Sequence, residues 1–335
     1  VRLNIKSDGD IETDGNLKTN NLSGKNKLIN GNFHVWQRST SSTAGGYVAA
    51  DRWYHNLSGA SMTFSRQAHT DPIDGSRYYG RIASTSSDDY CGIRQRVEDA
   101  ASIPEGKVTV SFWARGHVNG NLAVWGTIHY GSGGSPSSDV DLAEQRTAYL
   151  QNDTTFRKYS LTFTIPSHSG KTWGTNNDSY FEMAFGQGSG DSASAWTLDI
   201  SNIQLEVGSV ATAFEQRSYA EELHLCKRYY YKLHNADGNQ IRMVGYGGGG
   251  TTAGFTLMHQ PPMYKAPQGT LTANSLSYND GLAAYSGTGG WSFSGNRFST
   301  DVNTATNAGS GVLTGHCLSI YSGGSGTSIE LDAEL

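Results

Sequence analysis

The stretch Lys107-Val-Thr-Val-Ser-Phe-Trp-Ala-Arg115 decides the fold class. Its apolar residues Val108, Val110, Phe112 and Ala114 stand at every second position. A strand with this period turns one face toward a core and the other toward solvent or a second layer. The stretch therefore predicts a β-strand over 107–115 with one buried face.

Similar segments follow one another along the chain from Leu28 to Arg217. Runs rich in Gly, Ser and Asn separate them, as at 131–138 and 186–194. Strands recurring at this spacing favour a jelly-roll β-sandwich, which we predict over 28–217. The expected strands lie at 46–50, 61–66, 78–83, 90–97, 107–115, 122–130, 156–165, 180–185 and 195–206.

Residues 1–27 precede this domain and carry two short strand-like segments closed by glycine turns. Leu3, Ile5, Ile11 and Leu17 are too sparse to build a core within one chain. We predict a short β stalk that is stable when several chains wrap together, as in a homotrimer. A flexible leader is the alternative interpretation of the same residues.

The sequence Ser218-Tyr-Ala-Glu221 has the pattern of a helix capping box. It predicts a short linking helix over 218–228, after which the strand pattern restarts. We predict a second β-sandwich over 229–335, so the whole chain is expected to be all-β apart from this helix. Its expected strands lie at 229–233, 241–246, 254–258, 269–273, 290–293, 317–321 and 328–335.

Composition excludes several classes of protein. The net charge is −5 and only 16% of residues are charged, so no basic field exists to gather nucleic acid. No apolar run of about 18 residues is present, so we expect no membrane insertion. Cys91, Cys226 and Cys317 form no CxxC motif, which predicts three buried or semi-buried thiols rather than a zinc site or a disulfide framework. Free thiols fit synthesis in a reducing cytoplasm.

No catalytic motif stands out. The chain lacks a GxSxG nucleophile elbow and an HExxH metal motif. The glycine run at 245–250 is followed by Thr251 and Thr252, without the lysine of a phosphate-binding loop. Acidic residues fall in expected turns and at strand ends. We therefore expect a protein that is not an enzyme and that has no dedicated cofactor.

Aromatic residues beside polar loops are the best candidates for binding. Sugars pack their CH-rich faces on flat rings while polar side chains bind the hydroxyls. Four tryptophans, at positions 36, 53, 113 and 196, are assigned to the core. The predicted ligand-binding residues are Trp125 and Tyr130 beside the loop at 131–138, Trp173, Asn176 and Asp178 in the loop at 171–178, and Trp291.

Three parts of the sequence carry a family resemblance. The first is Lys27-Leu-Ile-Asn-Gly-Asn-Phe-His-Val-Trp-Gln-Arg38 with Ala49-Ala-Asp-Arg-Trp-Tyr54. It resembles the opening of the carbohydrate-binding-module-like jelly rolls of bacteriophage tail fibres. Residues 196–208 and 213–223 look like the closing strand and exit helix of that domain. Cys226-Lys-Arg-Tyr-Tyr-Tyr231 is similar to the start of the C-terminal β domain that follows in such proteins.

The resemblance implies a receptor-binding protein of the virion. It would be a homotrimer in the tail fibre, made in the host cytoplasm, joined to other virion tail proteins through its N-terminal end. Its ligand would be a bacterial cell-surface polysaccharide bound during host attachment. Some related jelly rolls also hold a structural calcium, for which Asn32 and Asp199 are the matching positions. This chain has His34 where relatives often carry an acid.

Two other functions stay open at this point. One is a structural fibre or decoration protein of the virion that binds no receptor. The other is a depolymerase that cuts the glycan it binds, although no internal repeat of the β-helix type is present.

Overall fold

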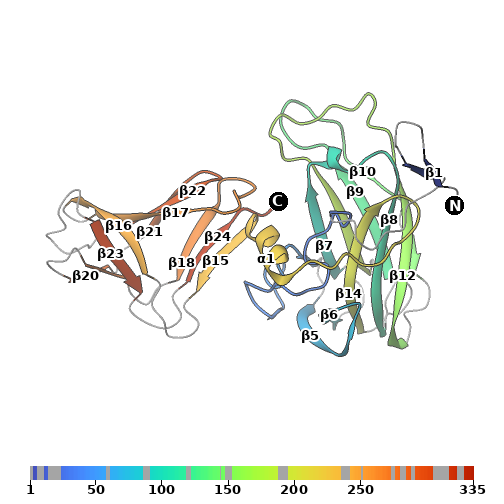
Figure 1. The fold of residues 1–335 in the computed structure, drawn as a ribbon, viewed down its shortest axis with the longest axis horizontal. Helices are drawn as coiled ribbons and strands as arrows, with labels where there is room; N and C mark the ends of the chain where they lie inside the picture. The colour runs from blue at the N-terminus through green and yellow to red at the C-terminus, as the bar shows by residue number, and fades with distance from the viewer. Residues whose placement is uncertain are drawn as a thin grey trace. The chain divides into compact units, whose positions relative to one another are not determined.

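The computed structural model describes residues 3–5, 11–13, 24–57, 61–85, 91–117, 122–143, 145–147, 153–187, 195–234, 242–249, 252–272, 276–279, 284–287, 291–304, 317–322 and 328–335. The chain forms two compact units. The first comprises residues 1–222 together with Leu335, and the second comprises residues 223–334. Each unit is built almost entirely of antiparallel strands (Figure 1).

The first unit is a β-sandwich of two antiparallel sheets. Sheet 1 has the strand order β10-β9-β13-β7-β4, and β11 also pairs with β9. Its strands are β10 (Val140–Asp141), β9 (Leu122–His129), β13 (Tyr180–Gln187), β7 (Cys91–Glu98), β4 (Tyr54–Leu57) and β11 (Gln145–Thr147).

Sheet 2 has the strand order β12-β8-β14-β6-β5-β3. Its strands are β12 (Asp153–Ile165), β8 (Gly106–His117), β14 (Trp196–Val207), β6 (Ser76–Ser84), β5 (Met62–Ile73) and β3 (Ser41–Ser42). A single 3₁₀ turn, η1 (Ala100–Ser102), follows β7.

The core of the first unit lies between the two sheets. Val108, Val110, Phe112 and Ala114 on β8 are all buried, which confirms the period-two prediction for this strand. The rings of Phe112 and Phe185, from opposite sheets, meet edge to face at 5.4 Å. Such contacts between inward-facing side chains join the two layers.

Strand β14 keeps its apolar side inward despite a change of register. Trp196, Leu198 and Ile200 are buried, as their spacing predicts. The pairing with β8 shifts between Ser201 and Gln204, which is the signature of a β-bulge. The bulge offsets the alternation by one residue, so Ile203 and Leu205 also enter the core.

The expected strand at 46–50 is not formed. Gly46 makes only an isolated bridge with His55, and the strand at this edge is β4. Gly46 has a φ of 103°, a conformation that favours glycine and interrupts a strand. Ala49 and Ala50 are buried in an irregular segment instead.

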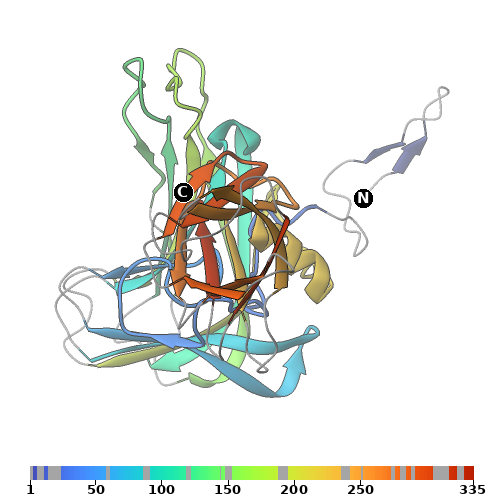
Figure 2. The same ribbon diagram turned by 90° about the vertical axis from the view of Figure 1, so that its left-hand side faces the viewer.

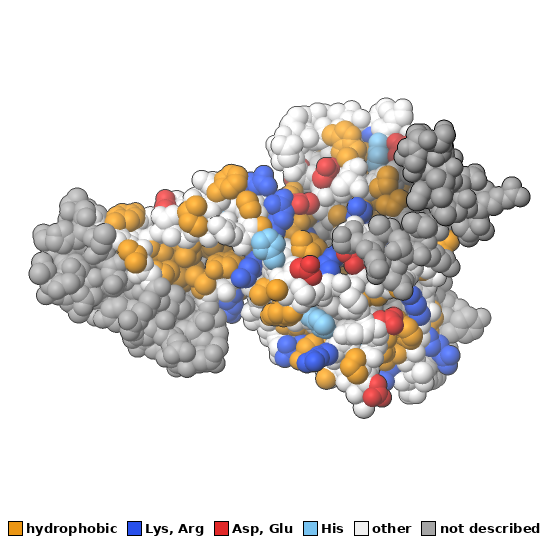
Figure 3. Space-filling model, viewed as in Figure 1, with side chains coloured by type: hydrophobic (Ala, Val, Ile, Leu, Met, Phe, Trp, Pro, Cys, Tyr) orange, Lys and Arg blue, Asp and Glu red, His pale blue; other side chains and the backbone are white. Residues whose placement is uncertain are grey.

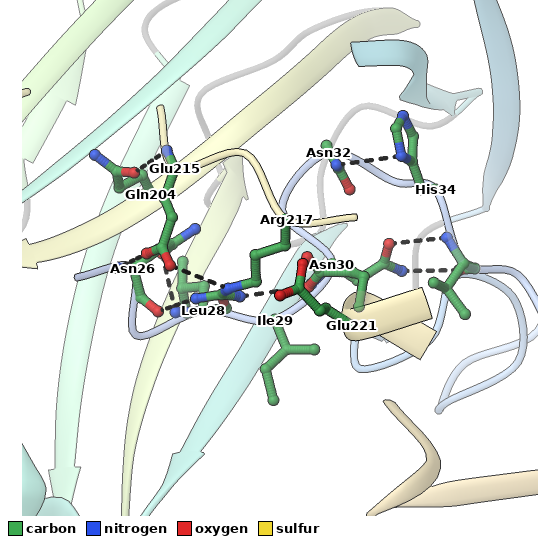
Figure 4. Close-up of polar contacts among 12 residues, drawn as sticks. Asn26, Leu28, Ile29, Asn30, Asn32, His34, Gln204, Glu215, Arg217 and Glu221 are labelled. Atoms are coloured by element: carbon green, nitrogen blue, oxygen red, sulfur yellow. Dashed lines mark hydrogen bonds and ion pairs between the residues drawn. The ribbon is translucent and has the colours of Figure 1, made fainter. Parts of the chain in front are cut away.

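The opening and closing stretches of the first unit are held together by buried hydrogen bonds (Figure 4). The Glu215 carboxylate accepts the backbone N–H groups of Gly24 at 2.6 Å and Asn26 at 2.7 Å. Arg217 donates to the carbonyl oxygens of Asn26 at 2.5 Å and Leu28 at 3.1 Å. Residues about 190 positions apart in sequence are therefore neighbours.

Helix α1 (Tyr219–Lys227) begins at the predicted capping box. The N–H of Ser218 donates to Glu221 Oε2 at 2.7 Å, and the N–H of Glu221 donates to Ser218 Oγ at 3.2 Å. These reciprocal bonds satisfy backbone donors that an uncapped helix leaves open. No helix in the described part of the chain is long and apolar enough to cross a membrane.

The second unit is also a pair of antiparallel sheets, whose strands surround a common interior in Figure 2. The smaller sheet has the order β15-β24-β18, with β15 (Tyr230–His234), β24 (Ser328–Asp332) and β18 (Gln268–Thr272). The larger has the order β20-β19-β23-β16-β17-β22-β21. Its strands are β20 (Ala284–Gly287), β19 (Leu276–Asn279), β23 (Cys317–Ser322), β16 (Arg242–Gly249), β17 (Thr252–Met258), β22 (Ser299–Thr304) and β21 (Trp291–Gly295).

The core of the second unit joins both of its sheets. Phe255 and Val302 of the larger sheet pack with Ile329 of the smaller one. Apolar side chains are also visible on the surface of this unit (Figure 3), where Val244 is 76% exposed. The sequence prediction missed β19, β20 and β22, which are short and rich in Ser, Thr, Asn or Asp and therefore give a weak strand signal.

The N-terminal segment contains the antiparallel pair β1 (Leu3–Ile5) and β2 (Ile11–Thr13). The two strand stubs of the predicted stalk are therefore present. Its role in joining several chains stays a prediction.

Candidate functional site

The outer face of sheet 1 gathers rings and charged groups. On strands β4, β7, β9 and β13, one set of alternate residues enters the core and the other set faces outward. We call the outward set the polar–aromatic face. It consists of Tyr54 on β4, Arg94 and Arg96 on β7, Trp125 and His129 on β9, and Tyr180 and Glu182 on β13.

Strand register places two of these rings on one row across the sheet. Trp125 pairs with Ala184, Ala184 with Arg94, and Arg94 with Tyr54. Three strand spacings separate the two rings, or roughly 14 Å between their backbones. Ala184 lies between Trp125 and Arg94 in this row, and its small side chain projects less from the sheet than theirs do.

The next row across the sheet has even smaller residues. Ala123 pairs with Gly186, and Gly186 pairs with Gly92. A Cβ atom placed on Gly186 would lie 2.4 Å from the carbonyl oxygen of Cys91. The close approach of the backbone therefore requires glycine at this position. Because its side chains are small or absent, this row projects little from the sheet beside Trp125.

Two arginines in the centre of the face share one carboxylate. Arg94 Nη1 lies 3.2 Å from Glu182 Oε1, and Arg96 Nε lies 2.9 Å from Glu182 Oε2. The guanidinium of Arg94 stacks over Tyr54 at 4.4 Å, and that of Arg96 stacks over Tyr180 at 4.3 Å. Ion pairing and stacking hold the guanidinium groups of Arg94 and Arg96 in place, while about a fifth of each arginine side chain stays exposed.

One end of the face is built from a ring pair. The rings of His129 and Tyr180 stack at 4.5 Å with an interplanar angle of 6°. Burial raises the pKa of the Tyr180 hydroxyl, which therefore stays protonated at neutral pH and can donate a hydrogen bond. Arg96 also donates to the carbonyl oxygen of Leu335, the residue that groups with this unit.

Of the residues predicted from sequence, Trp125 is the one that lies on the polar–aromatic face. Tyr130 is fully buried, so its ring is not available as a sugar platform. Trp173 is half-buried and packs against Tyr130 at 4.9 Å and against His168 at 5.2 Å. The loops at 131–138 and 171–178 hydrogen-bond to each other, for example from Asn176 N to Ser132 O, and Gly174 N also donates to Tyr130 O.

Asn176 and Asp178 brace the same pair of loops. Asp178 accepts hydrogen bonds from the N–H and the hydroxyl of Ser132, and Asn176 donates to Ser132 Oγ at 2.9 Å. The Ser132 hydroxyl and N–H bonds lower the pKa of Asp178. Trp291 pairs with Thr304 between β21 and β22, and its side chain lies outside the described residues.

Asn32 and Asp199 do not fit the predicted calcium site. Both oxygens of Asp199 accept guanidinium N–H groups, from Arg81 at 2.6 Å and from Arg115 at 2.8 Å. Asn32 Oδ1 is buried without a hydrogen-bond partner among the described residues, but one amide oxygen is far from the six to eight that calcium takes. Among the described residues, no group of three or more His, Cys, Asp or Glu side chains is placed to hold a metal ion.

Sequence reasoning missed most of the polar–aromatic face. Arg94 and Arg96 stand two positions apart on β7, a spacing that puts them on one side of a strand. Their partners Tyr54, Tyr180 and Glu182 come from strands distant in sequence. Only the strand order brings the three strands together, so the local signals were limited to the two-residue spacings on β7 and, for Tyr180 and Glu182, on β13.

Comparison with known proteins reveals a likeness of fold. No protein-family model matches the sequence, and no curated protein matches it. Among solved structures, the chain resembles a family 4 carbohydrate-binding module, with 18% identity over 46% of this chain and 94% of that chain, at a TM-score of 0.32. The N-terminal cellulose-binding domain of Cellulomonas fimi β-1,4-glucanase C gives 18% identity over 52% and 97%, at a TM-score of 0.29.

A domain of a bacteriophage tailspike protein is also similar in structure. The enzymatically active domain of bacteriophage CBA120 tailspike protein 4 is 13% identical over 54% of this chain, at a TM-score of 0.34. The match spans about a fifth of that chain (21%). All three are similarities to an all-β architecture with a β-sandwich like that of carbohydrate-binding modules.

Proposed function

We propose that the first unit binds a polysaccharide on the polar–aromatic face. The observation that carries this proposal is the row Trp125–Ala184–Arg94–Tyr54, with a ring near each end and a fixed planar donor between them. Rings at such positions can stack on the apolar faces of pyranoses, while guanidinium N–H groups bind hydroxyl oxygens. The row is long enough for several sugar units.

The charge balance of the face favours a neutral or weakly charged glycan. Glu182 neutralises one of the two arginines, and His129 lies 3.7 Å from the Asp139 carboxylate. We expect a single contact of this face with one glycan chain to be weak. Several copies acting together would raise the overall affinity by orders of magnitude without a new contact.

We propose that the chain is a tail-fibre adhesin of a bacteriophage virion. It acts as a homotrimer and binds a bacterial surface glycan during host attachment. The resemblance of 27–38 and 196–223 to tail-fibre jelly rolls supports this role. We also propose that the chain binds without cutting. A glycan of unchanged length after incubation with the protein would agree with this, and shortened chains would contradict it.

The binding proposal is tested with two substitutions and one matched control. Tyr54→Ala and Trp125→Ala should each weaken binding to a glycan identified on an array by about tenfold or more, because each removes one stacking ring. Trp113→Ala is the control, since Trp113 is half-buried on the outer face of sheet 2. Equal binding by all three variants would contradict the proposal.

Oligomeric state is tested separately. Size-exclusion chromatography with light scattering should give three times the chain mass of 36.0 kDa. A folded monomer would remove the trimer from the proposal and leave the binding face untouched.

A further inference from the structure

The outer face of sheet 2 carries a second cluster, in which one carboxylate serves two arginines. Asp199 on β14 pairs in register with Arg81 on β6 and with Arg115 on β8. Arg81 donates from Nε to Asp199 Oδ1 at 2.6 Å and from Nη2 to Oδ2 at 2.8 Å. Arg115 Nε donates to the same Oδ2 at 2.8 Å. The three side chains therefore form a single cross-strand row with a net charge of +1.

The hydrogen bonds of this row leave donors open. The Tyr79 hydroxyl accepts from Arg81 at 3.3 Å and from Arg115 at 3.1 Å, and Thr154 O accepts from Arg115 Nη1 at 3.2 Å. Arg81 Nη1 has no partner among the described residues. The side chains of Arg81 and Arg115 are 36% and 31% exposed, so a solute can reach them.

Rings stand beside the two guanidinium groups. Phe156 lies 4.6 Å beneath the guanidinium of Arg115 and 5.2 Å from Tyr79. His69 packs against Tyr79 and Phe156, in each case at 4.8 Å. His69 Nε2 is buried without a hydrogen-bond partner among the described residues. The cluster thus offers apolar ring surface beside a positive centre.

The two sheets differ in charge. Sheet 1 strands carry equal numbers of basic and acidic residues: Arg94, Arg96 and Arg146 against Glu98, Asp141 and Glu182. Sheet 2 strands carry an excess of basic residues: Arg66, Arg77, Arg81, Lys107, Arg115, Arg157 and Lys158 against Asp71, Asp153, Asp199 and Glu206. The strands of sheet 2 therefore carry a net charge of +3 in a chain whose net charge is −5, which favours an anion near their exposed basic side chains.

We propose that the Arg81–Arg115 cluster is a second binding site, which takes the negatively charged group of an acidic sugar residue. A carboxylate or phosphate group accepts the open guanidinium N–H groups, and the sugar ring packs beside Phe156. Asp199 aligns the two guanidinium groups and at the same time competes with the ligand for them. The site lies on the opposite sheet from the polar–aromatic face and does not depend on it.

Three small probes test this site at low ionic strength, where screening is weak. Sodium glucuronate should bind to the full chain and shift the NMR signals of the His69 ring, while glucose should do neither. Inorganic phosphate should bind more weakly than glucuronate, since it has no sugar ring to pack beside Phe156. Equal binding of glucose and glucuronate, or phosphate binding as strong as glucuronate binding, would overturn the assignment to an acidic sugar.

Two substitutions with opposite expected effects on glucuronate affinity distinguish a ligand site from a structural ion pair. Arg81→Met should weaken glucuronate binding about tenfold, and Arg66→Met, which removes another exposed arginine of the same sheet, should change it less than twofold. Asp199→Asn should tighten binding several-fold because it removes the competing carboxylate. If Arg81→Met binds as wild type or Asp199→Asn binds more weakly while both remain folded by circular dichroism, the proposal fails.

The outcome is distinguishable from that of the neutral-glycan proposal. Trp125→Ala should leave glucuronate binding unchanged, and Arg81→Met should leave neutral-glycan binding unchanged. Loss of glucuronate binding in Trp125→Ala would place the acidic-sugar site on sheet 1 and overturn the assignment to sheet 2.

Discussion

Glu215 accepts the backbone N–H of Asn26 at 2.7 Å, and both residues are buried. The other carboxylate oxygen of Glu215 accepts the N–H of Gly24. One charged side chain thus binds two backbone N–H groups of the entering chain, using hydrogen bonds of the stronger, charge-assisted kind.

Glu215→Gln should therefore lower the free energy of unfolding by about 2 kcal/mol, because an amide NH₂ replaces one of the two acceptors and faces a backbone donor. Urea unfolding of the full chain followed by tryptophan fluorescence measures this. Glu221→Gln is the control, since glutamine also serves at that position of a capping box and should cost little. Equal costs for the two variants would contradict the role given to Glu215.

His55 should make the first unit sensitive to acid. Burial lowers its pKa from the ordinary 6.5 to about 4, and Phe64 packs edge to face on its ring at 4.9 Å. The unfolded chain therefore binds this proton more readily, so the stabilising contribution is complete above pH 6.5 and is lost as the pH falls toward 4. The loss should approach 3 kcal/mol, taking roughly 1.4 kcal/mol for each pH unit of the shift.

Urea unfolding at pH 7, 5.5 and 4.5 measures this loss. His55→Gln should flatten the dependence of stability on pH in this range, and the exposed His224→Gln should leave it as in wild type. A variant at His55 with the wild-type slope would show that other groups cause the acid sensitivity.

Gly186 should tolerate no side chain. A Cβ atom there would lie 2.4 Å from Cys91 O and 2.9 Å from the Cα of Gly92, and neither is a flexible side-chain end. Gly186→Ala should destabilise the chain by about 2 kcal/mol or more, because β13 and β7 must move apart. At Gly170, with a φ of 74° and nothing within 4 Å, alanine should cost only about 1 kcal/mol. Thermal unfolding compares the two variants, and the order of their costs is the prediction.

Arg94 should contribute its shape as well as its charge. Arg94→Lys keeps a cation near Glu182 but loses the planar fork that stacks on Tyr54. Neutral-glycan affinity should fall about fivefold, equivalent to roughly 1 kcal/mol. Arg66→Lys is the matched control, since Arg66 stacks over Tyr78 at 4.7 Å on the other sheet. Unchanged affinity in Arg94→Lys would remove this residue from the binding face.

The fold was predictable where the signal is local. The spacing of the apolar residues from Val108 to Ala114 is enough to predict a strand with one buried face. Ser218 and Glu221 predict the start of a helix within four residues. The strand expected at 46–50 failed because its apolar residues enter the core from an irregular segment beside Gly46. Composition could not distinguish these two ways of burying Ala49 and Ala50.

The candidate site was less predictable, because it is assembled across strands. Trp125 was found from its own neighbours, whereas Tyr54 and Arg94 become partners only through pairing of β4 with β7. Tyr130 and Trp173 were predicted beside polar loops, yet those loops fold onto one another, so Tyr130 is buried and Trp173 is half-buried. A polar sequence around an aromatic residue thus does not ensure exposure when the polar groups satisfy each other.

The bonds from Glu215 and Arg217 to residues 24–28 also mean that the chain enters and leaves the first sandwich at the same place. Since its two ends lie together, the domain can be joined to other segments before or after it without disturbing its core.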